Sequence, residues 1–113
     1  MDSETVLVFT ANGMGTAETE LRLKLAKIFL GLISSSGMNG GKICFYTDGV
    51  KLACEGSPVL EELSALQRSS VEMILCKTCL DYFGLAAKVK VGVVGGMPDI
   101  IEAMNSARKV IHL

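Results

Sequence analysis

The sequence lacks tryptophan, and only 5% of its 113 residues are aromatic, so it offers no ring platform for stacking nucleic-acid bases. Eleven basic and twelve acidic residues nearly cancel, and no basic run indicates a nucleic-acid or membrane surface. No segment has the roughly 20 consecutive apolar residues that span a bilayer. The acidic start "MDSETVLVF" is unlike a secretory signal, so we expect a cytoplasmic location.

The sequence also has little that would hold a metal. Its four cysteines, Cys44, Cys54, Cys76 and Cys79, are irregularly spaced, which argues against a secreted disulfide framework. A structural zinc site normally needs four ligands, and the single histidine, His112, lies next to the end of the sequence. Cys44 falls in an apolar run, where cysteine is usually a small buried hydrophobe. We therefore expect free thiols, with no metal and no cofactor.

What the sequence does contain is five short apolar runs separated by longer helical patterns. The runs are "TVLVF", "KICFYT", "VEMILC", "VKVGVV" and "KVIHL". Their apolar residues are consecutive rather than alternating, which is typical of strands covered on both faces. The alternation predicts one domain over residues 1–113. Its fold would be a three-layer α/β/α sandwich with a five-stranded, mostly parallel sheet, and sites would gather at the carboxyl ends of the strands.

The first expected helix contains "ELRLKLAKIFLGLI". Four of its apolar residues share a face that we expect to pack on the sheet: Leu21, Leu25, Ile28 and Leu32. Leu23 and Leu30 lie on the opposite face, seven positions apart. They are either tolerated surface leucines or an interface between copies in a homo-oligomer.

Polar and glycine residues follow the expected strands. The first is followed by Asn12 and Gly13, and the second by Asp48 and Lys51. "NGMG" lacks the Walker and GxGxxG patterns, so these residues form either a weak anion site or an ordinary turn. "DGVK" is an ordinary turn, or it supplies Lys51 as a positive charge for a thiolate or an anionic substrate.

The segment "ILCKTCLDYFGL" places Cys76 at the end of the third strand and Cys79 three positions later. Thr78 with Asp81 resembles a variant capping box, which would put Cys79 at the first helical position. Free N–H groups and the helix dipole would then lower the thiol pKa and favour a reactive thiolate. The second thiol could resolve an oxidised or sulfur-loaded partner. The alternative is two buried thiols without chemistry.

"FYTDGVKLACEGSPVLEEL" and "VEMILCKTCLDYFGL" together resemble the DsrE-like domain of the YedF group, within the wider DsrE/TusD sulfur-relay family. The similarity extends from "VLVFTANGMG" to "ARKVIHL". The resemblance implies a parallel sheet of strand order 4-3-2-1-5, frequent oligomers, and sulfurtransferase-like proteins linked to selenium metabolism. It also implies a sulfur donor or acceptor protein as partner, such as a TusA-like carrier, which YedF proteins usually contain as an N-terminal domain.

In relay subunits of that family, the reactive cysteine ends the third strand and a glycine follows eight residues later. Cys76 and Gly84 match this spacing, so the resemblance implies Cys76 as the sulfur carrier. We rank Cys76 first because its position at the end of the strand would leave its sulfur at the cleft. The helix-dipole argument instead favours Cys79. A departure weakens simple relay, because Phe83 occupies the position where relay subunits commonly have arginine.

Three functional hypotheses remain. The first is a sulfur or selenium carrier or transferase that holds a persulfide on a strand-end cysteine and passes it to a partner protein. The second is a CxxC dithiol redox or sensor domain, which would use the same two thiols without carrying sulfur. The third is a non-enzymatic assembly subunit with inert cysteines.

Overall fold

The structure, a computed structural model, describes residues 1–113 and contains one five-stranded sheet in the order β4-β3-β2-β1-β5. The strands are β1 (Thr5–Phe9), β2 (Lys42–Phe45), β3 (Glu72–Cys76), β4 (Val93–Gly95) and β5 (Lys109–His112). Every neighbouring pair is parallel. The predicted fold class is confirmed, and the strand order is the one that the family resemblance implies.

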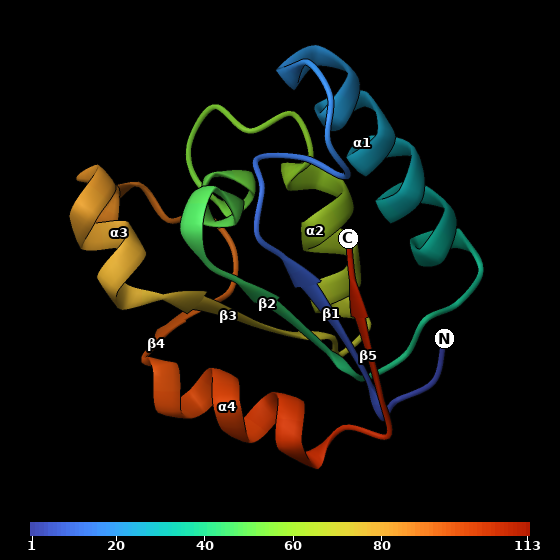
Figure 1. The fold of residues 1–113 in the computed structure, drawn as a ribbon. Helices are drawn as coiled ribbons and strands as arrows, with labels where there is room; N and C mark the ends of the chain where they lie inside the picture. The colour runs from blue at the N-terminus through green and yellow to red at the C-terminus, as the bar shows by residue number, and fades with distance from the viewer.

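Helices cover both faces of the sheet (Figure 1). They are α1 (Thr19–Ser35), α2 (Leu60–Arg68), α3 (Lys77–Phe83) and α4 (Met97–Ser106), with two short 3₁₀ helices, η1 (Thr47–Ala53) and η2 (Ala86–Lys88). Helices α1 and α2 pack side by side on one face, and α4 covers the other. Helix α3 and η1 lie at the end toward which the strands point. No helix combines the length and the apolar character needed to cross a membrane.

The three central strands form the core, and this explains their uninterrupted apolar sequence. Every residue of β1 is buried, as are the last three of β2 and the last four of β3. The rings of Phe9 and Phe45 stack with centroids 5.7 Å apart, at the carboxyl ends of their strands. The expected fourth strand is much shorter than "VKVGVV", because Gly92 turns the chain with a φ of 80° before β4 begins at Val93.

Helix α1 faces the core with the opposite side from the one predicted. Its buried residues are Ala26, Leu30 and Ile33, and Leu23 packs partly against the core. The four residues expected to contact the sheet are instead 42–64% exposed: Leu21, Leu25, Ile28 and Leu32. Because Leu30 is fully buried, it is neither a surface leucine nor part of an interface between copies, and Leu23 is only half-buried. Both faces carry leucines at helical spacing, so periodicity alone could not identify the face that α2 and the sheet cover.

Helix α3 starts earlier than predicted and follows β3 without a loop. Cys76 is the residue before the helix, and Lys77 is its first residue. No side chain caps the helix, and Asp81 pairs with Lys77 at 2.7 Å, so the capping box expected from Thr78 is absent. Gly84 ends the helix in the left-handed conformation, with a φ of 69°. This conformation is strained for residues with a Cβ atom and explains glycine at this position.

Candidate functional site

The loops after β1, β2 and β3 converge at the carboxyl end of the sheet. Gly49 makes this convergence possible, because a Cβ atom at this position would lie 2.0 Å from the carbonyl oxygen of Phe9. Helix η1 therefore sits directly over the end of β1. From the other side, the backbone N–H of Thr47 donates a hydrogen bond to the Cys79 sulfur at 3.1 Å. This bond joins η1 to α3.

Cys76 lies inside the protein rather than at an open cleft. As the last residue of β3, it pairs with Gly95 of β4, and only 2% of its surface is exposed. The expectation that the strand end would leave its sulfur at the cleft is not met. Pairing with β4 on one side and the direct continuation of the chain into α3 place Cys76 inside the protein.

Cys79 is the accessible member of the pair. It is the third residue of α3 and is partly exposed. It lines a groove of about 450 Å³ between η1 and α3, together with Thr47, Asp48, Thr78, Tyr82 and Phe83. The rings of Tyr82 and Phe83 meet edge to face, with centroids 5.4 Å apart. The groove thus presents one sulfur atom beside an aromatic wall.

The environment of Cys79 favours the protonated thiol, contrary to the thiolate that we expected. Partial burial raises the pKa of Cys79 most, followed by a hydrogen bond with the Cys76 thiol, and the charge of Asp48 raises it further. The Thr47 N–H opposes these effects, but only in part. Desolvation therefore outweighs the favourable helix terminus. Cys76 thus lies close enough to Cys79 to raise its pKa.

Thr47 is a component of the site that the sequence analysis missed. Its φ of 48° is in the left-handed region, which a β-branched residue rarely adopts and which costs about 1–3 kcal/mol. Its hydroxyl donates to the carbonyl oxygens of Thr10 and Tyr46, which holds this conformation. The conformation directs the Thr47 N–H toward Cys79. Nothing in "FYTDG" beyond a turn signal could have revealed this role.

Lys51 and Asp48 form an ion pair rather than acting separately. Their Nζ and Oδ1 atoms are 2.7 Å apart, and the same ammonium lies 4.4 Å from the centroid of the Phe83 ring. Such a cation–π contact contributes about 0.5–1 kcal/mol at an exposed site. Lys51 is not among the charges that act on the Cys79 pKa, so the expected lysine–thiolate pairing is absent. Phe83 instead anchors a positive charge that comes from η1.

Asn12 and Gly13 belong to the same end of the sheet but have different roles. Asn12 lines two further cavities, one of about 270 Å³ that reaches Asp48 and one of about 440 Å³ that reaches Lys51 and Phe83. Gly13 is buried with a φ of 128°, and a Cβ atom there would lie 2.5 Å from Arg22. The absence of a side chain at Gly13 thus allows the loop after β1 to pack closely against α1. Four of the predicted site residues line cavities: Asn12, Asp48, Lys51 and Cys79. The other two, Gly13 and Cys76, are buried and line none of these cavities.

The remaining two cysteines are both buried, although Cys54 borders the cavity of about 440 Å³ that reaches Lys51 and Phe83. Cys44 is fully buried in β2, and burial raises its pKa to about 11. Cys54 is 2% exposed, and its thiol donates to the carbonyl oxygen of Val50. Burial also raises the pKa of Cys54. Cys79 is therefore the most accessible of the four thiols.

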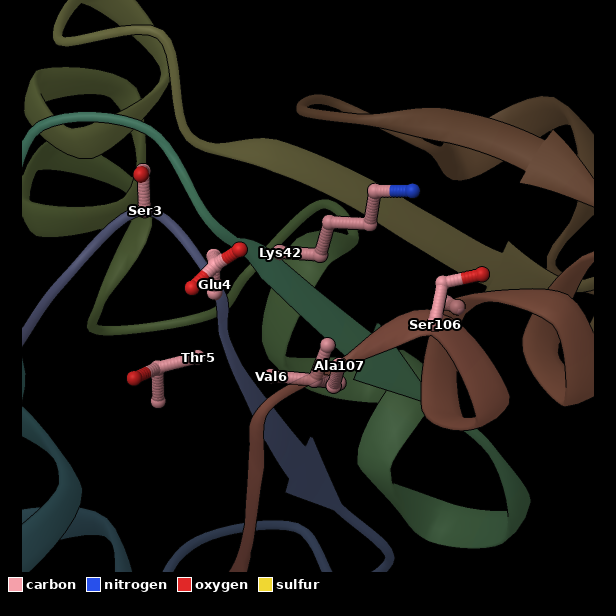
Figure 2. A pocket seen from close by; sticks show the side chains of 8 residues that line it. Ser3, Glu4, Thr5, Val6, Lys42, Ser106 and Ala107 are labelled. Carbon is pink, nitrogen blue, oxygen red and sulfur yellow. The ribbon is translucent and has the colours of Figure 1, made fainter.

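A separate pocket of about 190 Å³ lies near the amino ends of β1 and β2 (Figure 2). Its walls include Glu4, Thr5, Lys42 and Ser106, and no cysteine contributes to it. Lys42 also lies 3.9 Å from Glu72 of the neighbouring strand, so its charge is shared with that carboxylate. This pocket is thus separate from the groove at Cys79.

Comparisons with known proteins agree with this architecture. The sequence model of the DsrE/DsrF-like family matches residues 4–113. A search of curated proteins found no match. The crystal structure of the ychN protein from E. coli is similar with a TM-score of 0.70 and 23% identity, covering 98% of this chain and 99% of that one.

Two solved proteins of unknown function are also similar. One, from Methanobacterium thermoautotrophicum, has a TM-score of 0.70 and 17% identity and covers 96% of this chain and 97% of its own. The other, from Bacteroides thetaiotaomicron, has a TM-score of 0.65 and 15% identity, with 97% and 95% coverage. At these identities the structures establish a shared fold. Membership of the YedF group stays a prediction.

Proposed function

Because this chain belongs to the DsrE/DsrF-like family, we propose that it carries sulfur, accepting a sulfane sulfur on Cys79 and passing it to an acceptor protein. One observation above all supports this proposal. Of two thiols three positions apart at the start of α3, one lines an open groove at the carboxyl end of the sheet and the other is buried. This reverses the order in which the family resemblance ranks the two cysteines.

The loading step needs no cofactor. The Cys79 thiolate attacks the outer sulfur of a donor persulfide, forming a sulfur–sulfur bond to Cys79 while the donor leaves as its thiolate. The donor thiolate takes up the proton that Cys79 lost, so the step is balanced. The Thr47 N–H donates to the Cys79 sulfur and stabilises its negative form. Because the surroundings raise the Cys79 pKa, loading should accelerate as pH rises.

The groove also fits contact with a partner protein. Tyr82 is 84% exposed at its rim, and exposed aromatic residues are frequent anchors in interfaces. A TusA-like carrier would present its own cysteine at such a rim and exchange the outer sulfur with Cys79. Selenium has the same valence as sulfur and would bind at the same atom. Assembly into a homo-oligomer is compatible with this scheme if the Cys79 groove stays open.

Intact-mass measurement after incubation with a small-molecule persulfide tests the proposal. Measured immediately after loading, wild-type protein and Cys54→Ser should carry one added sulfur atom, which a thiol reductant removes, whereas Cys79→Ser should gain none. Cys54 is the matched control, since it is equally a cysteine near this end of the sheet but is buried. Stoichiometric loading of Cys79→Ser would contradict the assignment.

A dithiol redox function is the second candidate, and the placement of the two thiols three positions apart at the start of α3 favours it. In that case Cys76 and Cys79 would cycle between dithiol and disulfide without taking up sulfur. Equilibration with glutathione buffers measures the disulfide directly. A disulfide with a physiologically reachable potential, in a protein that never gains sulfur from a persulfide, would favour this function over sulfur transfer.

A further inference from the structure

We propose that Cys76 acts on the sulfur-loaded site, expelling the outer sulfur of a Cys79 persulfide as hydrosulfide and forming a Cys76–Cys79 disulfide. The inference rests on the proposed loading of Cys79 and adds a second reaction by which the sulfur leaves the protein. Transfer to an acceptor protein and release as hydrosulfide would then compete at one site.

The positions of the two sulfurs support this step. Cys79 lines the groove, so an added sulfur atom extends from it toward the open side. Cys76 is the residue before α3, close enough to Cys79 to raise its pKa, and is only 2% exposed, so it reaches the loaded residue from the buried side. An attacking thiol must approach the inner sulfur opposite the leaving one. The arrangement places attacker and leaving group on different sides of the Cys79 sulfur.

The backbone is compatible with the product. Cys76 precedes α3 and Cys79 is its third residue, so their Cβ atoms are about 5–6 Å apart, as for residues three positions apart on a helix. A disulfide requires a Cβ separation of about 3.5–4.5 Å. Cys76 is not itself helical, with φ −64° and ψ 118°, so a small rotation at the junction of β3 and α3 closes the difference.

The step balances without an external oxidant. The Cys76 sulfur bonds to the inner sulfur of the persulfide, the sulfur–sulfur bond of the persulfide breaks, and the outer sulfur leaves with the bonding electron pair. The proton of the Cys76 thiol goes to the departing sulfur, giving hydrosulfide. The sulfane sulfur is thereby reduced by two electrons, and the two cysteines are oxidised to the disulfide.

Return to the dithiol requires a reductant, and the structure indicates where it acts. A small dithiol reaches the Cys79 sulfur through the groove, whereas Cys76 is covered. Attack at Cys79 gives a mixed disulfide there and frees Cys76 as the leaving thiol. The other two cysteines should not react with the reductant or the disulfide. Cys44 is buried in β2, and the buried Cys54 thiol donates a hydrogen bond to the carbonyl oxygen of Val50.

A single-turnover experiment tests the inference. The protein is loaded with a small-molecule persulfide, excess donor is removed by gel filtration, and intact mass and released sulfide are followed without reductant. Wild-type protein and Cys54→Ser should release one equivalent of sulfide and end two hydrogens lighter than the reduced chain. Peptide mapping should join Cys76 to Cys79. Cys76→Ala should keep its added sulfur at least tenfold longer, and Cys76→Ser provides a second variant if alanine impairs folding.

The outcomes separate this inference from the proposed function. If wild-type protein loads but keeps its sulfur as long as Cys76→Ala, the release step is wrong and the carrier function stands. If Cys76→Ala releases sulfide at the wild-type rate, another group expels the sulfur and the inference is again wrong. If neither protein gains sulfur and wild type yields neither sulfide nor disulfide, the proposed loading fails and the release step with it.

Discussion

Two regions of the molecule each contain two side chains of the same kind, one buried and one accessible. They are the leucines of α1 and the cysteines at the start of α3, and burial has a different consequence in each region. In α1, Leu30 is fully buried and Leu32 is 64% exposed. Around the start of α3, Cys76 is 2% exposed and Cys79 lines a groove. For the leucines, the buried member matters most because it stabilises the fold. For the cysteines, the exposed member matters most because access decides which sulfur meets a reactant.

The largest effect should appear in the rates of thiol alkylation. Cys79 should react at neutral pH at least about a thousandfold faster than Cys44 or Cys76, because buried thiols of a stable domain become accessible only in rare open states. Mass spectrometry of partly labelled peptides measures the ratio. In denaturant all four cysteines should react at similar rates, which controls for reagent preference. Labelling of Cys76 before Cys79 would invalidate the comparison.

Substitutions of the two leucines should differ in their effect on the free energy of unfolding. Leu30→Ala should lower the free energy of unfolding by about 2–5 kcal/mol, because it leaves a cavity between α1 and the core. Leu32→Ala should change it by no more than about 0.5 kcal/mol. Chemical denaturation measures both values. Equal effects would mean that the Leu32 side of α1 is covered in solution, for example by a second copy of the chain.

The pH dependence of the Cys79 alkylation rate tests the raised pKa of the accessible cysteine. Since its pKa is raised, the alkylation rate should increase about tenfold per pH unit through neutrality and level off above about pH 8.5, the usual pKa of a thiol. Asp48→Asn should move this midpoint downward, because the Asp48 charge contributes to the raised pKa. A rate that is already constant at pH 7 would indicate a stabilised thiolate instead.

The smallest effect concerns the far end of α3. Gly84→Ala should cost about 1–2 kcal/mol, because alanine is strained in the left-handed conformation even though no atom lies within 4 Å of the new Cβ. The Cys79 alkylation rate should change less than about twofold, since the cysteine lies at the opposite end of the helix. Thermal unfolding and alkylation together check this. A large loss of reactivity would mean that the helix end controls the groove.

Much of the architecture could be predicted from the residues, because consecutive apolar runs and helical segments alternate regularly. The strand order followed from the family resemblance, and the convergence of Asn12, Asp48, Lys51 and the cysteines at one edge follows from parallel topology. The inward face of α1 was not predictable, because leucines occupy both faces. The inward cysteine was not predictable either, because the cover over Cys76 depends on pairing with Gly95 of a distant strand.

Electrostatic details of the site were the least accessible to sequence reasoning. The helix terminus suggested a lowered thiol pKa, yet partial burial and the neighbouring thiol reverse the direction. Lys51 is close in sequence to Asp48, and their pairing removes the lysine from the thiol. These outcomes depend on distances between side chains, and a linear pattern contains no information about them.

The hydrogen bond from position 47 to the reactive sulfur has a consequence for protein engineering. Its donor is a main-chain amide, so the Thr47 side chain contributes only by holding the left-handed backbone through its hydroxyl. Glycine and asparagine tolerate the left-handed backbone well, and either should preserve the contact while relieving strain. Proline alone eliminates the donor. The groove wall at this position is therefore open to redesign for new acceptors without altering what holds the thiol in place.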